Sequence, residues 1–428
     1  MDSIALVAGL VGLILIGAPV ALAMLMLPTI YVLLTDAAPM LTIPHQMYEA
    51  VAKLPLVAIP FFMLTGELMN SSTVTDRILD LSRRIVGRMR GGLAQVNVVS
   101  SMFFAGMNGS AVADTATIGT ILIPAMKRAG YPAAYAAGLT AVASTIGGII
   151  PPSIAMIILA STANLSVGAM FAAGIVPGIL IGLALMAVTW LLAVRRGYER
   201  STERFDLRAF AWAALRASGA LTLPVVLVGG ILGGWFSSVE SGAITAVLAV
   251  IIGRVVYRSL SLSDLVGAVG RTVRLTASVF IVIAAAGPFG WLLAKVGTIV
   301  AIEQWLLSFA ASPVLFVFAV LLVILAIGTF LDAPANIVLF GPVLISSSVA
   351  AGFSPVTAAL AVVIGFLVGM VTPPVGACWF LASRIAESPL EESAVQMLPY
   401  LAVEILVLAA LFVLPFLTLA IPDALGLL

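Results

Sequence analysis

The chain has 428 residues, of which 62% are hydrophobic and 9% are charged, and its mean hydropathy is +1.22. This composition excludes a soluble domain, and a net charge of +1 leaves no basic surface for nucleic acid. The single cysteine, Cys378, and the single histidine, His45, exclude a disulfide framework and a metal centre rich in either residue. Apolar stretches long enough to cross a bilayer recur along the chain, so the sequence predicts an all-α polytopic membrane protein.

The first half of the chain is expected to contain two helical regions, a basic arm, a hairpin, a broken helix and a final span. In chain order these lie at about 3–34 (broken at Gly17-Ala18-Pro19), about 55–70, about 73–90, about 92–128, about 132–163 (interrupted near 145–153) and about 168–194. His45 and Lys53 are assigned to a loop, with His45 a surface residue rather than a ligand.

The second half is expected to follow the same order. Its elements lie at about 212–235, about 242–257, about 272–294, about 299–310 (an arm), about 312–350 (a hairpin), about 354–384 (a broken helix, interrupted near 369–376) and about 398–421. The chain is thereby divided into a first repeat over 1–194, a cytoplasmic linker over 195–210 and a second repeat over 211–428.

The two halves share sequence at a fixed offset. Twenty of the 72 residues from Gly106 to Pro177 recur 222 positions later without a gap, whereas roughly six identities would be expected by chance. The shared Gly, Pro and polar residues lie in apolar segments, where a lipid-facing helix would avoid them. Paired interruptions in two halves of a membrane chain point to the binding site of a transporter.

The placement of lysine and arginine predicts how each half is oriented. Basic residues flank both ends of Gly92–Arg128, which should therefore leave and return on the cytoplasmic side as a re-entrant hairpin. The matching segment, about 312–350, lies between Gly297 and Ser383, where no lysine or arginine occurs. We expect it to enter from the opposite side, which makes the repeats inverted and puts both termini in the periplasm.

Each broken helix contains a Pro-Pro pair beside glycines, in Thr145–Ser153 and in Gly369–Gly376. Proline removes backbone donors and disfavours helix in the residue before it, so each helix should unwind and free its carbonyl oxygens. Carbonyls with a hydroxyl or two are suitable ligands for a hard monovalent cation. A pair of proline kinks that only adjust helix packing is the alternative, and the duplication at matching positions favours the cation site.

Each hairpin tip, Gly106–Thr115 and Gly328–Asn336, should expose the N-terminus of its returning helix. Unpaired N–H groups there suit a carboxylate, and the helix dipole favours its negative charge. Asp114 and Asp332 are expected to be the most deeply placed acids. Each either has a functional role or caps its helix by accepting backbone N–H bonds, and both alternatives stay open.

Other polar residues are given less specific interpretations. Glu67 and Glu240 are expected near membrane interfaces, and Cys378 is expected to be a small packed residue. The basic stripe on the arm, formed by Arg77, Arg84 and Arg88, is interpreted first as a face for lipid headgroups.

At this point the chain resembles the large membrane subunit (M or DctM type) of tripartite ATP-independent periplasmic (TRAP) transporters, over essentially its whole length. The segments that carry the resemblance are Pro60–Met69, Phe104–Ser110, Gly147–Ser153, Gly233–Gly242 and Gly369–Gly376. The resemblance implies the divalent-anion/sodium-symporter fold: an inverted-repeat transporter of the elevator type, with two re-entrant hairpins and two broken helices. It also implies a transporter rather than an enzyme.

The resemblance further implies where sodium and substrate bind. The sodium ligands, largely backbone carbonyls, would come in the first half from Gly106, Gly109, Gly148 and Pro151, and in the second half from Gly328, Gly369, Thr372 and Val375. A small organic acid, such as a C4-dicarboxylate or sialic acid, would bind between the tips at Asn108, Ser110, Asp332 and Asn336. Because the first tip has fewer hydroxyls than is usual in the family, backbone ligation is favoured there.

Two partners and a location are implied as well. A small four-helix membrane subunit and a periplasmic substrate-binding protein would work with this chain in the bacterial inner membrane. A stand-alone sodium/anion symporter of the same fold is the nearest alternative. An intramembrane aspartyl protease using Asp114 and Asp332 is a more distant one, because the segment Gly328–Asp332 lacks the GxGD pattern of such proteases. A channel is a further alternative, but the sequence has no continuous polar pore lining.

Overall fold

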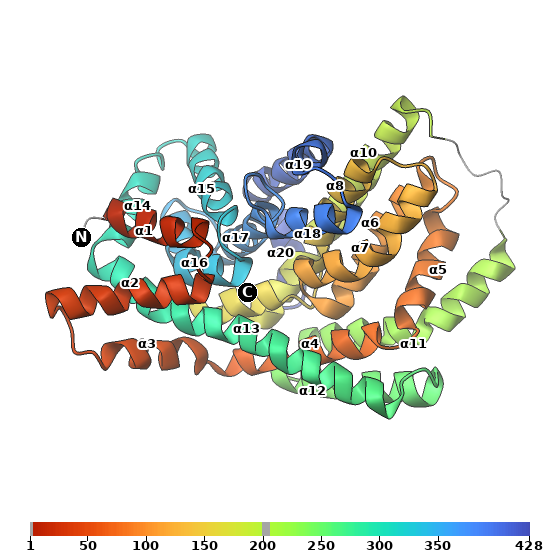
Figure 1. Cartoon of the computed structure of the whole chain (residues 1–428), viewed down its shortest axis with the longest axis horizontal. Helices are drawn as coiled ribbons and strands as arrows, with labels where there is room; N and C mark the ends of the chain where they lie inside the picture. The colour runs from red at the N-terminus through yellow and green to blue at the C-terminus, as the bar shows by residue number, and fades with distance from the viewer. Residues whose placement is uncertain (1–2, 199–205) are drawn as a thin grey trace.

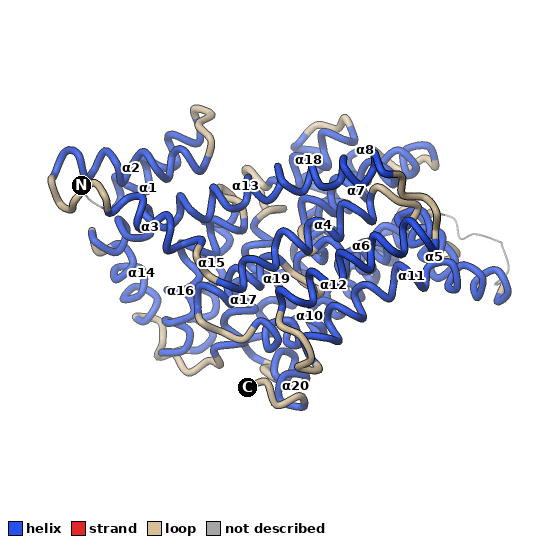
Figure 2. The backbone as a smooth tube through the Cα atoms, turned by 90° about the horizontal axis from the view of Figure 1, so that it is seen from below, coloured by secondary structure: helices blue, strands red, loops and turns tan. Residues whose placement is uncertain are grey.

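The computed structural model describes residues 3–198 and 206–428, so residues 199–205 of the expected linker lie outside the described part. Every regular element in the described ranges is a helix (Figures 1 and 2). This confirms the all-α fold class.

The helices of the first half are α1 (Ser3–Leu15), α2 (Val20–Thr35), α3 (Thr42–Val51), η1 (Leu54–Val57), α4 (Ala58–Asn70), α5 (Val74–Val86), α6 (Gly92–Asn108), α7 (Ala111–Arg128), α8 (Ala133–Ala143), η2 (Ser144–Gly148), α9 (Ile154–Ala163) and α10 (Val167–Arg195).

The helices of the second half are α11 (Leu207–Leu232), α12 (Ser238–Ile251), η3 (Ile252–Val256), α13 (Leu262–Lys295), α14 (Thr298–Leu307), α15 (Pro313–Gly328), α16 (Ala333–Ala350), α17 (Pro355–Gly369), α18 (Ala377–Ala386), α19 (Leu390–Val413) and α20 (Phe416–Ala424).

The offset found in the sequence is also present in the helix boundaries. Helices α7 and α16 begin and end 222 residues apart, and α8 and α17 begin 222 residues apart. The predicted order of hairpin, broken helix and span is therefore found in both halves. The predicted breaks are found as well, because η2 and a non-helical segment separate α8 from α9, and a non-helical segment separates α17 from α18.

Several helices are long and apolar enough to cross a membrane. Within the described ranges these are α10, α11, α12 with η3, α13, α16 and α19. Helix α3 and the segment η1–α4 form a seventh candidate span, bent by 65° at the break between them. The chain is therefore a multi-pass membrane protein by length and composition.

Several boundaries differ from those expected; α11 and α19, for example, begin about five and about eight residues before their expected starts. The region of His45 is helix α3 rather than a loop, because Ile43, Met47 and Val51 recur at helical spacing; His45 itself is exposed, as expected. Helix α13 begins about ten residues before the expected start because Ser261 and Asp264 form a capping box. The last span is two helices rather than one, since Pro415 follows the end of α19.

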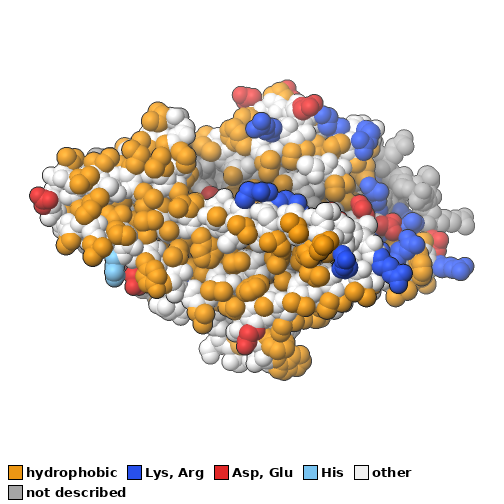
Figure 3. Space-filling view, turned by 60° about the horizontal axis from the view of Figure 1, so that its bottom comes forward, with side chains coloured by type: hydrophobic (Ala, Val, Ile, Leu, Met, Phe, Trp, Pro, Cys, Tyr) orange, Lys and Arg blue, Asp and Glu red, His pale blue; other side chains and the backbone are white. Residues whose placement is uncertain are grey.

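The most deeply buried elements lie at the centre of the molecule. Nearly every side chain of α8, η2, α9 and α17 is buried. Along one edge, α13 packs beside α3 and α4, and α12 packs against α4 (Figure 1). The space-filling view shows a largely hydrophobic face, with most of the visible Lys and Arg side chains towards the end that carries α5 and the beginning of α11 (Figure 3).

Candidate functional site

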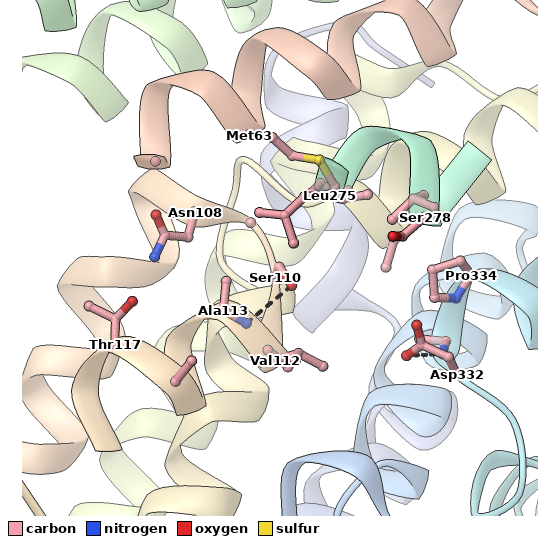
Figure 4. Close-up of a pocket in the computed structure, with 18 of the residues that line it drawn as sticks. Met63, Asn108, Ser110, Val112, Ala113, Thr117, Leu275, Ser278, Asp332 and Pro334 are labelled. Atoms are coloured by element: carbon pink, nitrogen blue, oxygen red, sulfur yellow. Dashed lines mark hydrogen bonds between the residues drawn. The ribbon is translucent and has the colours of Figure 1, made fainter. Parts of the chain in front are cut away.

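A cavity of about 370 Å³ lies where the two hairpin tips face each other. The first tip contributes Asn108–Ala113 and the second contributes Asp332–Pro334. Helices α4 and α13 contribute further lining residues, namely Met63, Gly66, Glu67 and Asn70 from α4 and Leu275, Ser278 and Val279 from α13. Figure 4 shows Ser110 and Asp332 on facing sides of this cavity, with Leu275 and Ser278 beside them.

Gly109 lies at the centre of the first tip, and any other residue at this position would be strained. Gly109 ends α6 with φ +61°, and a Cβ on it would lie 2.7 Å from the carbonyl oxygen of Pro152. Ser110 then caps α7, its Oγ accepting a hydrogen bond from the Ala113 amide at 3.4 Å. The amides of Ala111 and Val112 precede the first intrahelical bond and lie at the cavity wall.

The second tip presents a carboxylate in place of a hydroxyl. Asp332 caps α16, and its Oδ1 accepts a hydrogen bond from the Ala333 amide at 3.0 Å. Pro334 follows and has no N–H group to offer. The side chain of Asp332 is exposed to the cavity (Figure 4). The two ends of the cavity therefore differ chemically: one offers backbone donors and the other a carboxylate acceptor.

Glu67 lines the cavity, although we expected it near a membrane interface. Its Oε2 accepts a hydrogen bond from the Arg271 Nε at 2.6 Å, and its side chain is 15% exposed. No Lys, Arg or His of the described chain lines the cavity itself, so Arg271 is a basic group held beside it rather than in it. An anion in this cavity would be bound by helix N-termini and dipoles rather than by a buried cation.

Three of the four expected substrate residues meet in the cavity: Asn108, Ser110 and Asp332. The fourth, Asn336, does not line it. Its side chain is fully buried, and its Nδ2 donates a hydrogen bond to the carbonyl of Leu331 at 2.8 Å, which holds the tip in shape. The structure thus places Asn336 behind the tip.

The first break is joined to the first tip by backbone and side-chain hydrogen bonds. The Ile154 amide donates to the Gly109 carbonyl at 3.1 Å. Ser153 caps α9 and donates its Oγ–H to the carbonyl of Gly148 at the far end of the break. The peptide bond between Pro151 and Pro152 is cis. The two hydrogen bonds therefore close the break on itself and hold it against the first tip.

The second break is also joined to its tip by a backbone hydrogen bond. The Gly376 amide donates to the Thr329 carbonyl at 3.3 Å. The donor is equivalent to Ile154 at the offset of 222 residues, whereas the acceptor lies two residues before the equivalent of Gly109. Gly328 and Gly369 touch through their backbones, since a Cβ on Gly369 would lie 2.7 Å from the Cα of Gly328. Thr372 donates its hydroxyl to the Val368 carbonyl at 2.8 Å.

The expected sodium ligands lie in these two junctions between tip and break. Carbonyls at the end of a helix have no intrahelical donor, and those of Gly106 and Gly328 are among them. The carbonyls of Gly109 and Gly148 each accept one hydrogen bond and keep a second lone pair. No cluster of three or more His, Cys, Asp or Glu side chains exists in the described chain, so a cation here would depend on backbone and hydroxyl oxygens.

Asp114 is fully buried and does not cap its helix. Ser110 has that role, and both carboxylate oxygens of Asp114 are buried without a hydrogen-bond partner. Its Cβ lies against Gly147, where an added Cβ would be 3.0 Å away. Of the two acids, then, Asp332 is a capping residue and Asp114 is not.

Glu404 was missed by the sequence reasoning, which named only Asp114 and Asp332 as deep acids. It lies within α19 and is fully buried beside Thr145 of the first break. Glu404 is the one acid of α19 beyond its first turn, in the apolar part of the helix, and an acid in that position is a signal of function that could have identified it.

The remaining interpretations have mixed outcomes. Cys378 is buried, as expected. Glu240 is exposed and closes a capping box with Ser237 at the start of α12. Arg77, from the stripe interpreted as a face for lipid headgroups, donates to the Arg216 carbonyl at 3.1 Å and lies 3.6 Å from the ring centroid of Tyr257.

Comparison with known proteins finds a related family over nearly the whole chain. Residues 7–417 match the family model described as the tripartite ATP-independent periplasmic transporter, DctM component. The chain is 32% identical over 418 residues to the sialic acid TRAP transporter large permease protein SiaM of Vibrio cholerae, covering 97% of each chain. It is 34% identical over 381 residues to the C4-dicarboxylate TRAP transporter large permease protein DctM of Pseudomonas aeruginosa, covering 89% of each.

A solved structure has the same overall fold. The Alcanivorax borkumensis YdaH transporter superposes with a TM-score of 0.61 over 87% of each chain, at 17% sequence identity. At this identity the likeness concerns the fold alone.

Proposed function

We propose that this chain, which belongs to the DctM component family of tripartite ATP-independent periplasmic transporters, takes up a small organic acid across the inner membrane and couples that uptake to sodium. The observation that supports the substrate class most directly is the cavity of about 370 Å³ between the two tips. It has room for a small molecule, and it offers helix N-terminal amides to a negative charge.

The two ends of the cavity suggest how the substrate lies. We expect a carboxylate to accept hydrogen bonds from the amides of Ala111 and Val112, with the Ser110 hydroxyl and Asn108 amide beside it. Asp332 then accepts hydrogen bonds from hydroxyl or amino groups at the other end of the molecule. A second carboxylate would meet the negative charge of Asp332, so an acid with one carboxylate and several donors fits better than a symmetrical dicarboxylate.

Sodium is proposed to travel with the substrate, bound at the two junctions between tip and break. The first site uses carbonyls of Gly106, Gly109, Gly148 and Pro151. The second uses Gly328, Gly369, Thr372 and Val375. Because the tips also form the cavity, a cation at either junction would fix the tip that binds the substrate, and this supplies the coupling between the two.

Transport is proposed to follow an elevator movement of inverted repeats. The two hairpins and two broken helices, α6–α9 and α15–α18, form the mobile part, and α4 and α13 belong to the fixed scaffold. The cavity is lined from both sets of helices, which is the position expected for a substrate carried along the boundary between them. A small membrane subunit and a periplasmic binding protein complete the transporter.

The proposal is tested by uptake into proteoliposomes that contain this chain, its small subunit and its binding protein, with an imposed sodium gradient. We expect uptake of a hydroxylated monocarboxylate that stops when sodium is replaced by potassium or when the gradient is collapsed. Uptake that continues without sodium would refute the coupling. Equal uptake without the binding protein would favour the stand-alone symporter.

A substitution of Asp332 tests the orientation of the substrate. Asp332→Asn keeps an N-cap on α16 but removes the charge, so dicarboxylates should compete at least several-fold better, while hydroxylated acids bind more weakly. Asp332→Ala loses the cap as well and should also destabilise the protein, by about 1 kcal/mol. Unchanged competition by dicarboxylates in Asp332→Asn would contradict the proposed orientation.

The aspartyl protease alternative is not supported. It requires the two carboxylates to share a site, whereas Asp332 lines the cavity and Asp114 does not. The related proteins of this family are transport permeases rather than enzymes.

A further inference from the structure

The buried acid Glu404 lies away from the substrate cavity, in the interior next to the first break. Its side chain is fully buried in α19, a helix that packs against α8, α10, α17 and α18. Oε1 of Glu404 is hydrogen-bonded to Oγ1 of Thr145, the second residue of η2. Oε2 has no partner at all. An ionised carboxylate in this position would be both desolvated and poorly hydrogen-bonded.

No basic group compensates Glu404. Helices α8, α15 and α17 contain no Lys, Arg or His. Arg195 in the last turn of α10 and Arg384 in the last turn of α18 are both exposed. A buried charge without a partner is strongly unfavourable, so the neutral acid is favoured.

The other titratable groups around Glu404 are neutral or acidic, apart from Arg196 at the end of α10. That arginine is exposed, lies 4.8 Å from the ring centroid of Tyr135 and donates a hydrogen bond to Gln396 rather than to Glu404. Cys378 on α18 is within electrostatic reach of Glu404 and of Asp114 on α7. Tyr400 lies one turn before Glu404 on α19, and its hydroxyl is 3.0 Å from that of Tyr135 on α8. None of these groups hydrogen-bonds to Oε2 of Glu404, which has no hydrogen-bond partner.

The hydrogen atoms around Thr145 can be counted. Its hydroxyl lies 2.7 Å from the carbonyl oxygen of Val142 and is also bonded to Glu404. The hydroxyl has one hydrogen to give, so it cannot donate to both oxygens. If Glu404 is protonated, the acid donates to Thr145, and Thr145 donates to Val142. Each close contact then has one donor and one acceptor.

We propose that Glu404 is a proton-binding site, and that the undissociated acid donates a hydrogen bond to Thr145 in this conformation. On release, the O–H bond of the acid breaks and the proton passes to water that reaches the site. The hydroxyl hydrogen of Thr145 then turns from Val142 to the carboxylate. No other covalent bond changes, and the entering water carries the proton away to the bulk solvent.

The proton is expected to influence the first break. Thr145 lies in η2, which leads directly to Gly148, and the hydrogen bond to Val142 is part of that turn. Loss of the proton draws the Thr145 hydroxyl away from the turn and places a charge beside it. If the proposed sodium function is correct, protons and the sodium site in the first half are therefore linked.

Infrared spectroscopy of the purified chain in lipid nanodiscs tests the proton directly, without transport. The wild type should show the carbonyl stretching band of an undissociated carboxylic acid that persists at neutral pH and loses intensity in Glu404→Gln, with Asp114→Asn reporting the contribution of the other fully buried acid. The matched control is Glu391→Gln, an exposed acid on the same helix, which should leave the band unchanged. Absence of the band from the wild type, or an undiminished band in Glu404→Gln, would overturn the proposal. A carboxylate band that depends on sodium would overturn it in favour of a bound cation.

Thermal unfolding across pH gives a second measure. Glu404→Gln retains a donor to Thr145 and cannot ionise, so it should unfold at the temperature of the wild type in acid, below the ordinary glutamate pKa of about 4.3, where both states of the wild type are protonated. As pH rises from there to neutral, the unfolded wild type releases the proton and the folded wild type keeps it, so the wild type should lose stability that Glu404→Gln retains. Thr145→Val should shift the acid band, because its hydrogen-bond acceptor is gone. Identical dependence of the unfolding temperature on pH between acid and neutral pH in the wild type and Glu404→Gln would contradict the proposal.

The link between the Glu404 proton and sodium is tested by measuring uptake as a function of pH. Sodium-driven uptake by the wild type should fall as pH rises, and Glu404→Gln should remove that part of the fall. If both proteins lose uptake together, the proton does not act on the break. If the wild type takes up nothing at any pH, the proposed function fails, while the infrared test of Glu404 is unaffected.

Discussion

At the scale of single residues, the contact between Gly328 and Gly369 is a close approach of two backbones at the second junction between tip and break. Each glycine is where the sequence placed a cation site, and the structure brings their backbones into contact. The sequence could identify this pair because both halves keep a glycine there. It could not predict that Asn336 turns away from the cavity, since that depends on a hydrogen bond to a backbone carbonyl five residues earlier.

Replacing Gly369 by alanine tests whether that contact is needed. The new Cβ would lie 2.7 Å from backbone atoms of Gly328, which cannot move as a side chain can, so α15 and α17 must separate. We expect a loss of about 1–3 kcal/mol of stability and loss of uptake, with membrane insertion intact. Fluorescence-detected gel filtration and proteoliposome uptake measure the two effects.

The matched control is Gly229→Ala in α11, where nothing lies within 4 Å of the added Cβ. Helix propensity favours alanine over glycine, so this variant should be as stable as the wild type or slightly more so. Normal uptake by Gly369→Ala, with Gly229→Ala also normal, would show that close approach of the two backbones is not required.

At the scale of elements, the hydrogen-bonded ion pair between Glu67 and Arg271 connects α4 to α13 at the edge of the cavity. Arg271→Gln would leave the Glu67 carboxylate uncompensated beside an anionic substrate. We expect the KM for uptake to rise about tenfold, which corresponds to about 1.4 kcal/mol, with a stability change of at most about 1 kcal/mol.

The double variant Glu67→Gln with Arg271→Gln removes both charges, and it should return the KM to near the wild-type value. Arg274→Gln, an exposed arginine on the same helix, should have no effect. A double variant as impaired as Arg271→Gln alone would show that Arg271 acts by itself and not by neutralising Glu67.

The elements also show what limited prediction from the sequence. Hairpins and breaks were found because glycine, proline and polar residues interrupt long apolar runs. Helix α3 was missed because it is short and partly polar, and its amphipathic spacing is visible only over about three turns. The start of α13 was not predicted, although Ser261 and Asp264 form a capping box that is visible in the sequence. The expected start followed the hydropathy of the segment rather than its capping residues.

At the scale of the whole molecule, duplication was predictable because it appears in residue identities and again in helix boundaries. The position of Glu404 was not, because it depends on how the last long helix packs against the first break, 259 residues away along the chain. Orientation in the membrane rests on the charge distribution alone. Basic residues flank the first hairpin and are absent around the second, so the two should face opposite sides.

Single cysteines can decide this orientation, because the chain has one cysteine and it is buried. In a Cys378→Ala background, Ala129→Cys and Ala351→Cys place a thiol at identical residues 222 positions apart, each just after the returning helix of its hairpin. Ala129 is exposed and Ala351 is half-buried, and neither has the positive φ of the glycine that follows it. An impermeant maleimide should label Ala351→Cys from the periplasm of intact spheroplasts and label Ala129→Cys only after lysis. Labelling of both thiols from one side would refute the inverted arrangement, and with it the equivalence of the two sodium sites.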